Sequence, residues 1–206
     1  MPPAFSLPAE KEKLLAYAAE HPQKMFVQKT NTHRGIKIEQ LSKLNLDEGG
    51  SFVQEFIHNP LLVDGYKFDI GVYVTLTSVD PLRIYVHQSD ALLRFCSVQY
   101  HPFDSANRDK YVVGDDYLPS WQVPSFTKFM TEKVGFSFKD ALNGHIKSLG
   151  RDPDVMWSNI YNTISEVYQS QEGNLARAAS QYPVARDTFF EMVRFDFVID
   201  DQLRST

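Results

Sequence analysis

Two cationic side chains and a glycine lie close together near the start of the chain, in a segment that could hold phosphate. Lys29 stands in an apolar run, and the Arg34-Gly35 turn leads into the alternating residues Ile36 and Ile38. Glycine lets backbone N–H groups approach an anion closely, and Lys and Arg supply the counter-charge. The pattern predicts a strand, a turn and a second strand that fold over phosphates. A solvated hairpin with two surface cations is the alternative.

A second charged pair stands in the most regular strand pattern of the chain. Between positions 64 and 76, five apolar residues alternate with polar ones, which is typical of a strand with one buried face. Lys67 and Asp69 therefore project side by side from the other face. Such a pair can contact a ligand, or it can be a surface ion pair that contributes little.

Two more charged residues stand in apolar strands. Arg94 follows two leucines, and a guanidinium there requires an anionic partner. Asp196 is flanked by Phe195 and Phe197, so an alternating strand would point it away from both rings.

The composition excludes some classes of protein. With 206 residues, 43% of them hydrophobic, the chain can bury a core and form one domain or somewhat more. The formal net charge of -5 offers no basic surface for nucleic acid. The single cysteine, Cys96, excludes an internal disulfide, and its apolar setting predicts an unreactive thiol, which allows a reducing compartment. We expect neither a membrane span nor a signal peptide from the sequence.

The elements around these residues follow from local pattern. Helix formers predict a helix from Pro8 to Glu20 with Ser6 as its cap, within a helical lead-in over residues 1–24. Residues 25–95 predict five or six strands, and 97–125 an irregular excursion. Helices are expected over 124–133, 138–149 and 153–169, and a loose linker over 171–185. A strand is expected over 189–199, with Asp200 in the turn that follows.

These segments together resemble the tubulin tyrosine ligase-like family, which has an ATP-grasp fold. The resemblance covers most of residues 20–100 and returns at 189–200. The matching motifs, in the family's order, are Gln28-Lys29, His33-Arg34-Gly35-Ile36, Gln54-Glu55-Phe56-Ile57, Asn59-Pro60-Leu61-Leu62, Lys67-Phe68-Asp69, Asp80-Pro81-Leu82-Arg83 and Leu93-Arg94-Phe95.

The resemblance implies an α+β, ATP-grasp-like fold with an antiparallel sheet core and packed helices. It implies a nucleotide-binding sheet over residues 25–100, a loop and helical region over 101–185, and a metal-ligand strand over 186–206. The family's N-terminal lobe and its final strand, which ends in a Glu-x-Asn pattern, are missing. The chain is therefore expected to be a fragment with an open sheet edge at 189–199.

The resemblance also implies roles for particular residues. The expected ATP-binding residues are the lid residues Lys29, Arg34 and Gly35, the adenine hinge Gln54, Glu55, Phe56 and Ile57, and the strand residues Lys67 and Asp69. Arg94 would hold the carboxylate of an amino-acid substrate, with an internal salt bridge as the alternative. Asp196 would be one of three Mg²⁺ ligands. No residue, including His33, is expected to be catalytic in its own right.

The family reaction activates a carboxylate with ATP to form an acyl phosphate, which an amino acid then attacks. The resemblance implies an ATP- and Mg²⁺-dependent ligase of the polyglutamylase type, which adds glutamate rather than glycine or tyrosine to tubulin. Its expected location is the cytoplasm, on microtubules, with cilia as one candidate place.

Several departures from the family pattern weaken the expected activity. Gly71 stands where the family has an arginine that neutralises phosphate. The family's His-Leu-Thr-Asn-Tyr motif is not found after Tyr100, which leaves open whether Asp115 or Asp116 takes its role. Because Asp196 is the only recognisable Mg²⁺ ligand and the strand that should pair with 189–199 is missing, we expect residues 1–206 alone not to ligate. A catalytically impaired nucleotide-binding or microtubule-associated module is the alternative, and a scaffold that binds no ATP is a third hypothesis.

Overall fold

The computed structural model describes residues 2–30, 36–132, 137–182 and 188–205. Within them the chain forms a mixed α/β fold with two antiparallel sheets and four α-helices. The strands are β1 (Ala4–Leu7), β2 (Phe26–Thr30), β3 (Lys37–Glu39), β4 (Ser51–Glu55), β5 (Leu62–Val63), β6 (Tyr66–Val79), β7 (Leu82–Val86), β8 (Leu92–Phe95), β9 (Leu118–Pro119) and β10 (Glu191–Phe197). The helices are α1 (Lys11–Glu20), α2 (Pro124–Glu132), α3 (Phe138–Ser148) and α4 (Pro153–Ala179).

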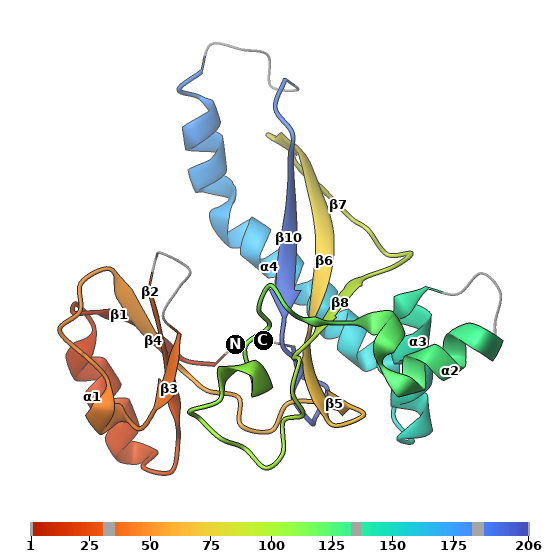
Figure 1. Ribbon diagram of the computed structural model, residues 1–206. Coiled ribbons are helices and arrows are strands. Elements are labelled where there is room, and N and C mark those ends of the chain that lie inside the picture. The colour runs from red at the N-terminus through yellow and green to blue at the C-terminus, as the bar shows by residue number, and fades with distance from the viewer. Residues whose placement is uncertain (1, 31–35, 133–136, 183–187, 206) are drawn as a thin grey trace.

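The smaller sheet has the strand order β1-β4-β2-β3. A compact apolar cluster joins it to α1, and its buried members are Leu7, Leu14, Phe26, Leu44 and Val53. In Figure 1 this sheet and α1 lie to one side of the long strands β6 and β10, while α2 and α3 lie to the other side. The smaller sheet is thus a separate layer with its own small core.

The larger sheet has the order β10-β6-β8-β9, and β5 and β7 also pair with β6. Its central strand, β6, follows the predicted alternation: Phe68, Ile70 and Val72 are buried, whereas Tyr73 on the opposite face is exposed. β10 is the terminal strand of this sheet and pairs with β6 along its whole length.

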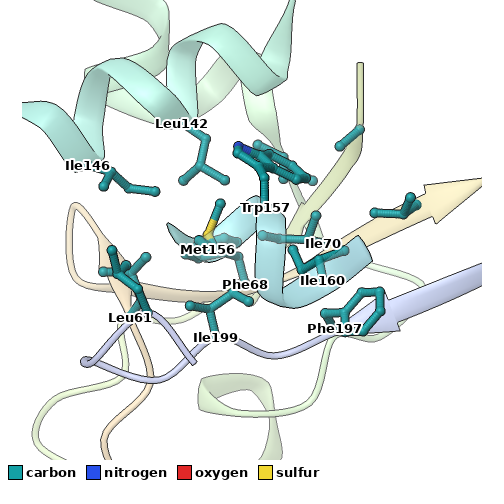
Figure 2. Close-up of a cluster of buried hydrophobic side chains, with 14 of the residues drawn as sticks. Leu61, Phe68, Ile70, Leu142, Ile146, Met156, Trp157, Ile160, Phe197 and Ile199 are labelled. Carbon is teal, nitrogen blue, oxygen red and sulfur yellow. The ribbon is translucent and has the colours of Figure 1, made fainter. Parts of the chain in front are cut away.

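The main core lies between the buried face of the larger sheet and the helices. Figure 2 shows Leu142 and Ile146 of α3 and Met156, Trp157 and Ile160 of α4 gathered over Phe68 and Ile70 of β6. Local sequence signals mark the first turns of both helices. Ser137 and Asp140 form a capping box at α3, and the Asp152 side chain accepts from the backbone of Asp154 at the start of α4, which has proline in its first turn. The helices therefore cover one face of the larger sheet and leave the Lys67/Asp69 face for other contacts.

Three expectations about local structure were wrong. Residues 4–7 form β1, which pairs with β4, so the lead-in is not purely helical; α1 begins at Lys11, and Ser6 does not cap it. Helix α4 continues to Ala179 through the expected linker, because Leu175 packs against the main core and the neighbouring residues are helix formers. Residues 25–95 contain seven strands, since the two-residue β5 adds one.

Other expectations are confirmed. The predicted helices at 124, 138 and 153 all form. Cys96 is buried, and its burial raises the pKa of the thiol to about 11, which keeps it protonated and unreactive at neutral pH. Asp200 lies in a turn, where its carboxylate accepts hydrogen bonds from Gln202 and Arg204. In the part of the chain that the structure describes, we find no helix that is both long and apolar enough to cross a membrane.

Candidate functional site

A cavity of about 470 Å³ lies between the two sheets. Strands β2, β3 and β4 contribute to one side, and β6, β10 and the excursion after β8 contribute to the other. The expected site residues that line it are Lys29, Gln54, Glu55, Phe56, Ile57, Lys67, Asp69 and Asp196. Residues from distant parts of the sequence thus meet around one space.

Two lysines give this cavity its positive charge. Lys29 reaches from β2, where its Nζ donates to Gln54 Oε1 at 3.0 Å and lies 5.7 Å from the centre of the Phe52 ring. Lys67 is only 6% exposed, and its Nζ donates to the Tyr111 carbonyl at 2.9 Å. Burial lowers the pKa of Lys67, and burial together with the charge of Lys67 lowers the pKa of Lys29. Two partly desolvated ammonium groups that repel each other favour the binding of an anion.

The hinge segment at the end of β4 is anchored by its own backbone and by one carboxylate. The backbone N–H of Phe56 donates to the Met25 carbonyl at 2.9 Å. The Glu55 carboxylate accepts from the Tyr17 hydroxyl and from Lys24 Nζ, both at 2.5 Å. Burial acts to raise the pKa of Glu55, but these two bonds outweigh it and lower the pKa. The Glu55 side chain therefore ties the hinge to α1 and to the segment before β2.

Asp69, Arg94, Asp196 and Arg194 form a network of ion pairs on the face of the larger sheet that carries Lys67. Arg94 donates to both Asp69 oxygens, at 3.0 and 2.7 Å, and to Asp196 Oδ2 at 3.0 Å. Arg194 donates to Asp196 Oδ1 at 2.6 Å and to Oδ2 at 3.1 Å. Burial raises the pKa of Asp69 although the Arg94 guanidinium opposes it. Arg94 thus forms the internal salt bridge that was the alternative to a substrate contact.

This network bears on the expected Mg²⁺ site. Both oxygens of Asp196 accept bonds from guanidinium groups. Among the residues that the structure describes, no group of three or more His, Cys, Asp or Glu side chains is arranged to hold a metal ion. Mg²⁺ requires several hard oxygen ligands in near-octahedral geometry. The described residues therefore do not fit a magnesium ion by themselves.

The remaining expected residues lie elsewhere. His33, Arg34 and Gly35 fall outside the described residues, so the lid turn stays a prediction. Asp115 and Asp116 are exposed and do not line the cavity. Asp200 lines a second cavity of about 630 Å³, which shares the hinge residues 55–57 with the first.

Two contributions were missed by the sequence reasoning. Tyr111, Val112 and Val113 of the irregular excursion line the cavity, and no local pattern distinguishes them from other loop residues. Arg194 was also missed, although the argument that selected Arg94, a guanidinium in an apolar strand, applies to it equally. Arg194 could therefore have been found from the sequence.

Comparisons with known proteins identify the family of the chain. Residues 1–206 match the Tubulin-tyrosine ligase family. The chain is 48% identical over 204 residues to the Caenorhabditis elegans protein named "Probable tubulin polyglutamylase ttll-15", a match that covers 98% of this chain and 39% of that protein. It is 30% identical over 216 residues to Mus musculus "Tubulin monoglutamylase TTLL4" and 28% identical over 211 residues to Homo sapiens "Tubulin polyglutamylase TTLL5".

These two matches cover 98% and 99% of this chain but only 17% and 16% of the two relatives, so the chain spans a minor part of the length of all three. The family match, in contrast, extends over every residue from 1 to 206. The chain belongs to the tubulin-tyrosine ligase family.

Proposed function

We propose that this chain is the nucleotide-binding part of an ATP-dependent ligase that adds glutamate to tubulin through an acyl phosphate. The observation that carries the proposal is the single cavity on which Lys29, the hinge 54–57, Lys67, Asp69 and Asp196 converge. The names of the relatives, which are polyglutamylases and a monoglutamylase of tubulin, support the choice of glutamate and tubulin. The protein would then work on microtubules.

The cavity has the two kinds of wall that a nucleotide requires. Val27, Ile38, Phe56 and Ile57 provide apolar contact suited to a base, and the two lysines provide charge suited to phosphates. A nucleotide held between two sheets is the arrangement of an ATP-grasp fold. We therefore assign the base to the hinge side of the cavity and the phosphates to the Lys67 side.

The same residues suggest how the chain would position the reaction. Lys29 and Lys67 would orient the phosphates and stabilise the negative charge on the phosphoryl oxygens in the transition state, which favours transfer. Arg94 would donate hydrogen bonds to the carboxylate of the amino acid in place of part of its bonding to Asp196. A magnesium ion would need ligands beyond the described residues, so we route no step through it.

A catalytically impaired nucleotide-binding module is the second candidate function. The observation that favours it is the pairing of Asp196, the expected metal ligand, with two arginines. In that case the cavity would still bind ATP, and the protein would act through microtubule association. A scaffold that binds no ATP is the third.

Titration of ATP into the purified chain tests these alternatives. We expect saturable binding that Lys67→Met abolishes or strongly weakens, whereas Lys13→Met, a change at a 73% exposed side chain on α1, leaves it intact. Absence of ATP binding by the unaltered chain would leave only the scaffold. Where ATP binds, incorporation of labelled glutamate into tubulin separates the ligase from the impaired module.

A further inference from the structure

Gly71 and Arg194 occupy one space on the open face of the larger sheet. Gly71 lies opposite Asp196 in the β6–β10 register, and Arg194 lies opposite Tyr73, one step along the same face. A Cβ atom on residue 71 would lie 2.7 Å from Arg194 Cδ and 3.2 Å from both Arg194 Nε and Asp196 Oδ1. The Arg194 side chain therefore crosses directly over Gly71. Real Cβ atoms essentially never approach another atom to within 3.0 Å, so any side chain at position 71 would require the Arg194 side chain to shift.

Arg194 does not itself line the cavity, but its guanidinium group contacts a residue that does. Arg194 Nε lies 2.6 Å from Oδ1 of Asp196, which itself lines the cavity. Arg94 contacts the same carboxylate from the other side, at 3.0 Å. The Arg194 side chain is 31% exposed, so a ligand can reach it without unfolding the sheet.

The charges around Arg194 favour the binding of an anion. The cations Lys29, Lys67, Arg94 and Arg194 stand against three carboxylates around the cavity, those of Glu55, Asp69 and Asp196. Glu55 is already paired with Lys24, so the cations remain in excess. Both arginines have a bidentate carboxylate partner, but the side chain of Asp69, the partner of Arg94, is 13% exposed, whereas that of Asp196, the partner of Arg194, is 39% exposed. A phosphate group, which carries more than one charge, fits such an excess of cations better than a single carboxylate does.

We propose that Arg194 binds an anion in this site and contacts the terminal phosphate of the bound nucleotide. The absence of a side chain at Gly71 leaves the space that the Arg194 side chain occupies. This inference rests on the proposed nucleotide-binding function. The arginine that the family resemblance expects at position 71 is then not lost. A guanidinium reaches the same place from the neighbouring strand, and the glycine is a requirement of that arrangement rather than a defect.

A double-mutant cycle tests whether an arginine at position 194 replaces one at position 71. The unaltered chain, Arg194→Ala, Gly71→Arg and the double variant Gly71→Arg/Arg194→Ala are compared for binding of ATP and of AMP. Arg194→Ala should weaken ATP binding about tenfold or more, the cost of a charged hydrogen bond, with AMP binding changed less than about twofold. Gly71→Arg alone should also weaken ATP binding, because its side chain meets Arg194. The double variant should recover ATP affinity to within about threefold of the unaltered chain, because a guanidinium is again present in the vacated space.

Folding is monitored in parallel so that a loss of binding is not mistaken for unfolding. Gly71→Ala should lower the thermal unfolding midpoint in the unaltered background and much less in the Arg194→Ala background, because the clash is with the arginine side chain. If ATP binds in a Lys67-dependent manner but Arg194→Ala binds it as tightly as the unaltered chain, or loses ATP and AMP equally, the role of Arg194 is wrong while the proposed function stands. If the unaltered chain binds no ATP, both proposals are wrong.

Discussion

Lys67 Nζ donates a hydrogen bond to the carbonyl of Tyr111, 44 residues away, at 2.9 Å. The bond joins the central strand β6 to the irregular excursion that follows β8, at the wall of the cavity. A buried ammonium group is costly, and one carbonyl compensates only part of its lost hydration. The chain therefore keeps a charge at this place at the expense of stability, which is typical of a binding site.

Lys67→Met should weaken ATP binding by about 2–3 kcal/mol, because a charged hydrogen-bonding group is lost, while the thermal unfolding midpoint rises or stays the same. The rise is expected because methionine fills a similar volume without a buried charge. Calorimetric unfolding and ATP titration measure the two effects. A variant that both unfolds more easily and binds ATP normally would assign Lys67 a structural role.

The pH dependence follows from the same burial. The pKa of Lys67 and that of Lys29 are lowered from the ordinary value of 10.5, so both lose their protons earlier than a surface lysine as pH rises. ATP affinity should therefore decline with rising pH before 10.5 is reached. The free energy of unfolding should change in the opposite direction. The folded state holds the Lys67 proton less tightly than the unfolded state does, so the free energy of unfolding rises with pH between the folded and unfolded pKa values of Lys67. Affinity that stays constant up to pH 10 would contradict the proposed role of the lysines.

Lys29→Ala and Arg34→Ala should each weaken ATP binding by about 1–3 kcal/mol, the range for a charge-assisted hydrogen bond whose partner remains. His33→Ala, in the same segment, is the control and should change ATP affinity much less. Fluorescence titration with a nucleotide analogue measures all three. Unchanged affinity in both cation variants would remove the lid from the site.

Glu55 should stabilise the fold at neutral pH and lose this contribution in acid. Its carboxylate accepts from Tyr17 and Lys24, and the folded pKa lies below the ordinary value of 4.5. Its contribution is therefore complete above that value and is lost as pH falls through the folded pKa. Glu55→Gln should cost about 1–3 kcal/mol at neutral pH, and the difference from the unaltered chain should shrink in acid. Chemical denaturation at several pH values tests this, and a constant difference would count against it.

Arg94 should contribute both to stability and to substrate binding. Arg94→Ala leaves the largely buried Asp69 carboxylate without its bidentate partner and should cost about 2 kcal/mol of unfolding free energy, less than a fully buried pair because Arg94 is partly exposed. Arg94→Lys keeps a cation beside Asp69 and should preserve the fold. In a preparation that transfers glutamate, the lysine variant should raise KM for glutamate and leave ATP binding nearly intact. If Arg94→Lys has the same KM for glutamate as the unaltered protein, Arg94 has a structural role only.

Removal of divalent metal should have little effect on ATP binding by residues 1–206. Asp196 gives both oxygens to arginines, and the described residues offer no group of three metal-ligating side chains. EDTA and added Mg²⁺ should therefore change the ATP affinity of this chain only slightly, and glutamate transfer by the chain alone should not be detected. Strong Mg²⁺ dependence would mean that Asp196 exchanges its arginines for the metal.

Much of this structure follows from local sequence. The two-residue alternation of β6 predicted the apolar face that covers the core, because a strand that covers a core must point every second residue inward. It did not predict that Lys67, on the opposite face, is buried as well. The helical patterns over 124–133, 138–149 and 153–169 predicted where α2, α3 and α4 begin. The turn at Asp200 and the buried, unreactive Cys96 also followed from their neighbours.

The site itself depended on contacts that no local pattern contains. Lys29 and Lys67 approach each other only because the two sheets face one another, and Tyr111 reaches Lys67 only because an irregular segment returns over the strand. Likewise, Arg194 lies over Gly71 because the β6–β10 register sets them one step apart on one face. Sequence alone determined most of the elements and the chemical groups that they carry, although not β1, β5 or the last turns of α4. The tertiary structure decided which groups meet, because distances between residues far apart in the chain are set by sheet pairing and packing rather than by the preferences of neighbouring residues.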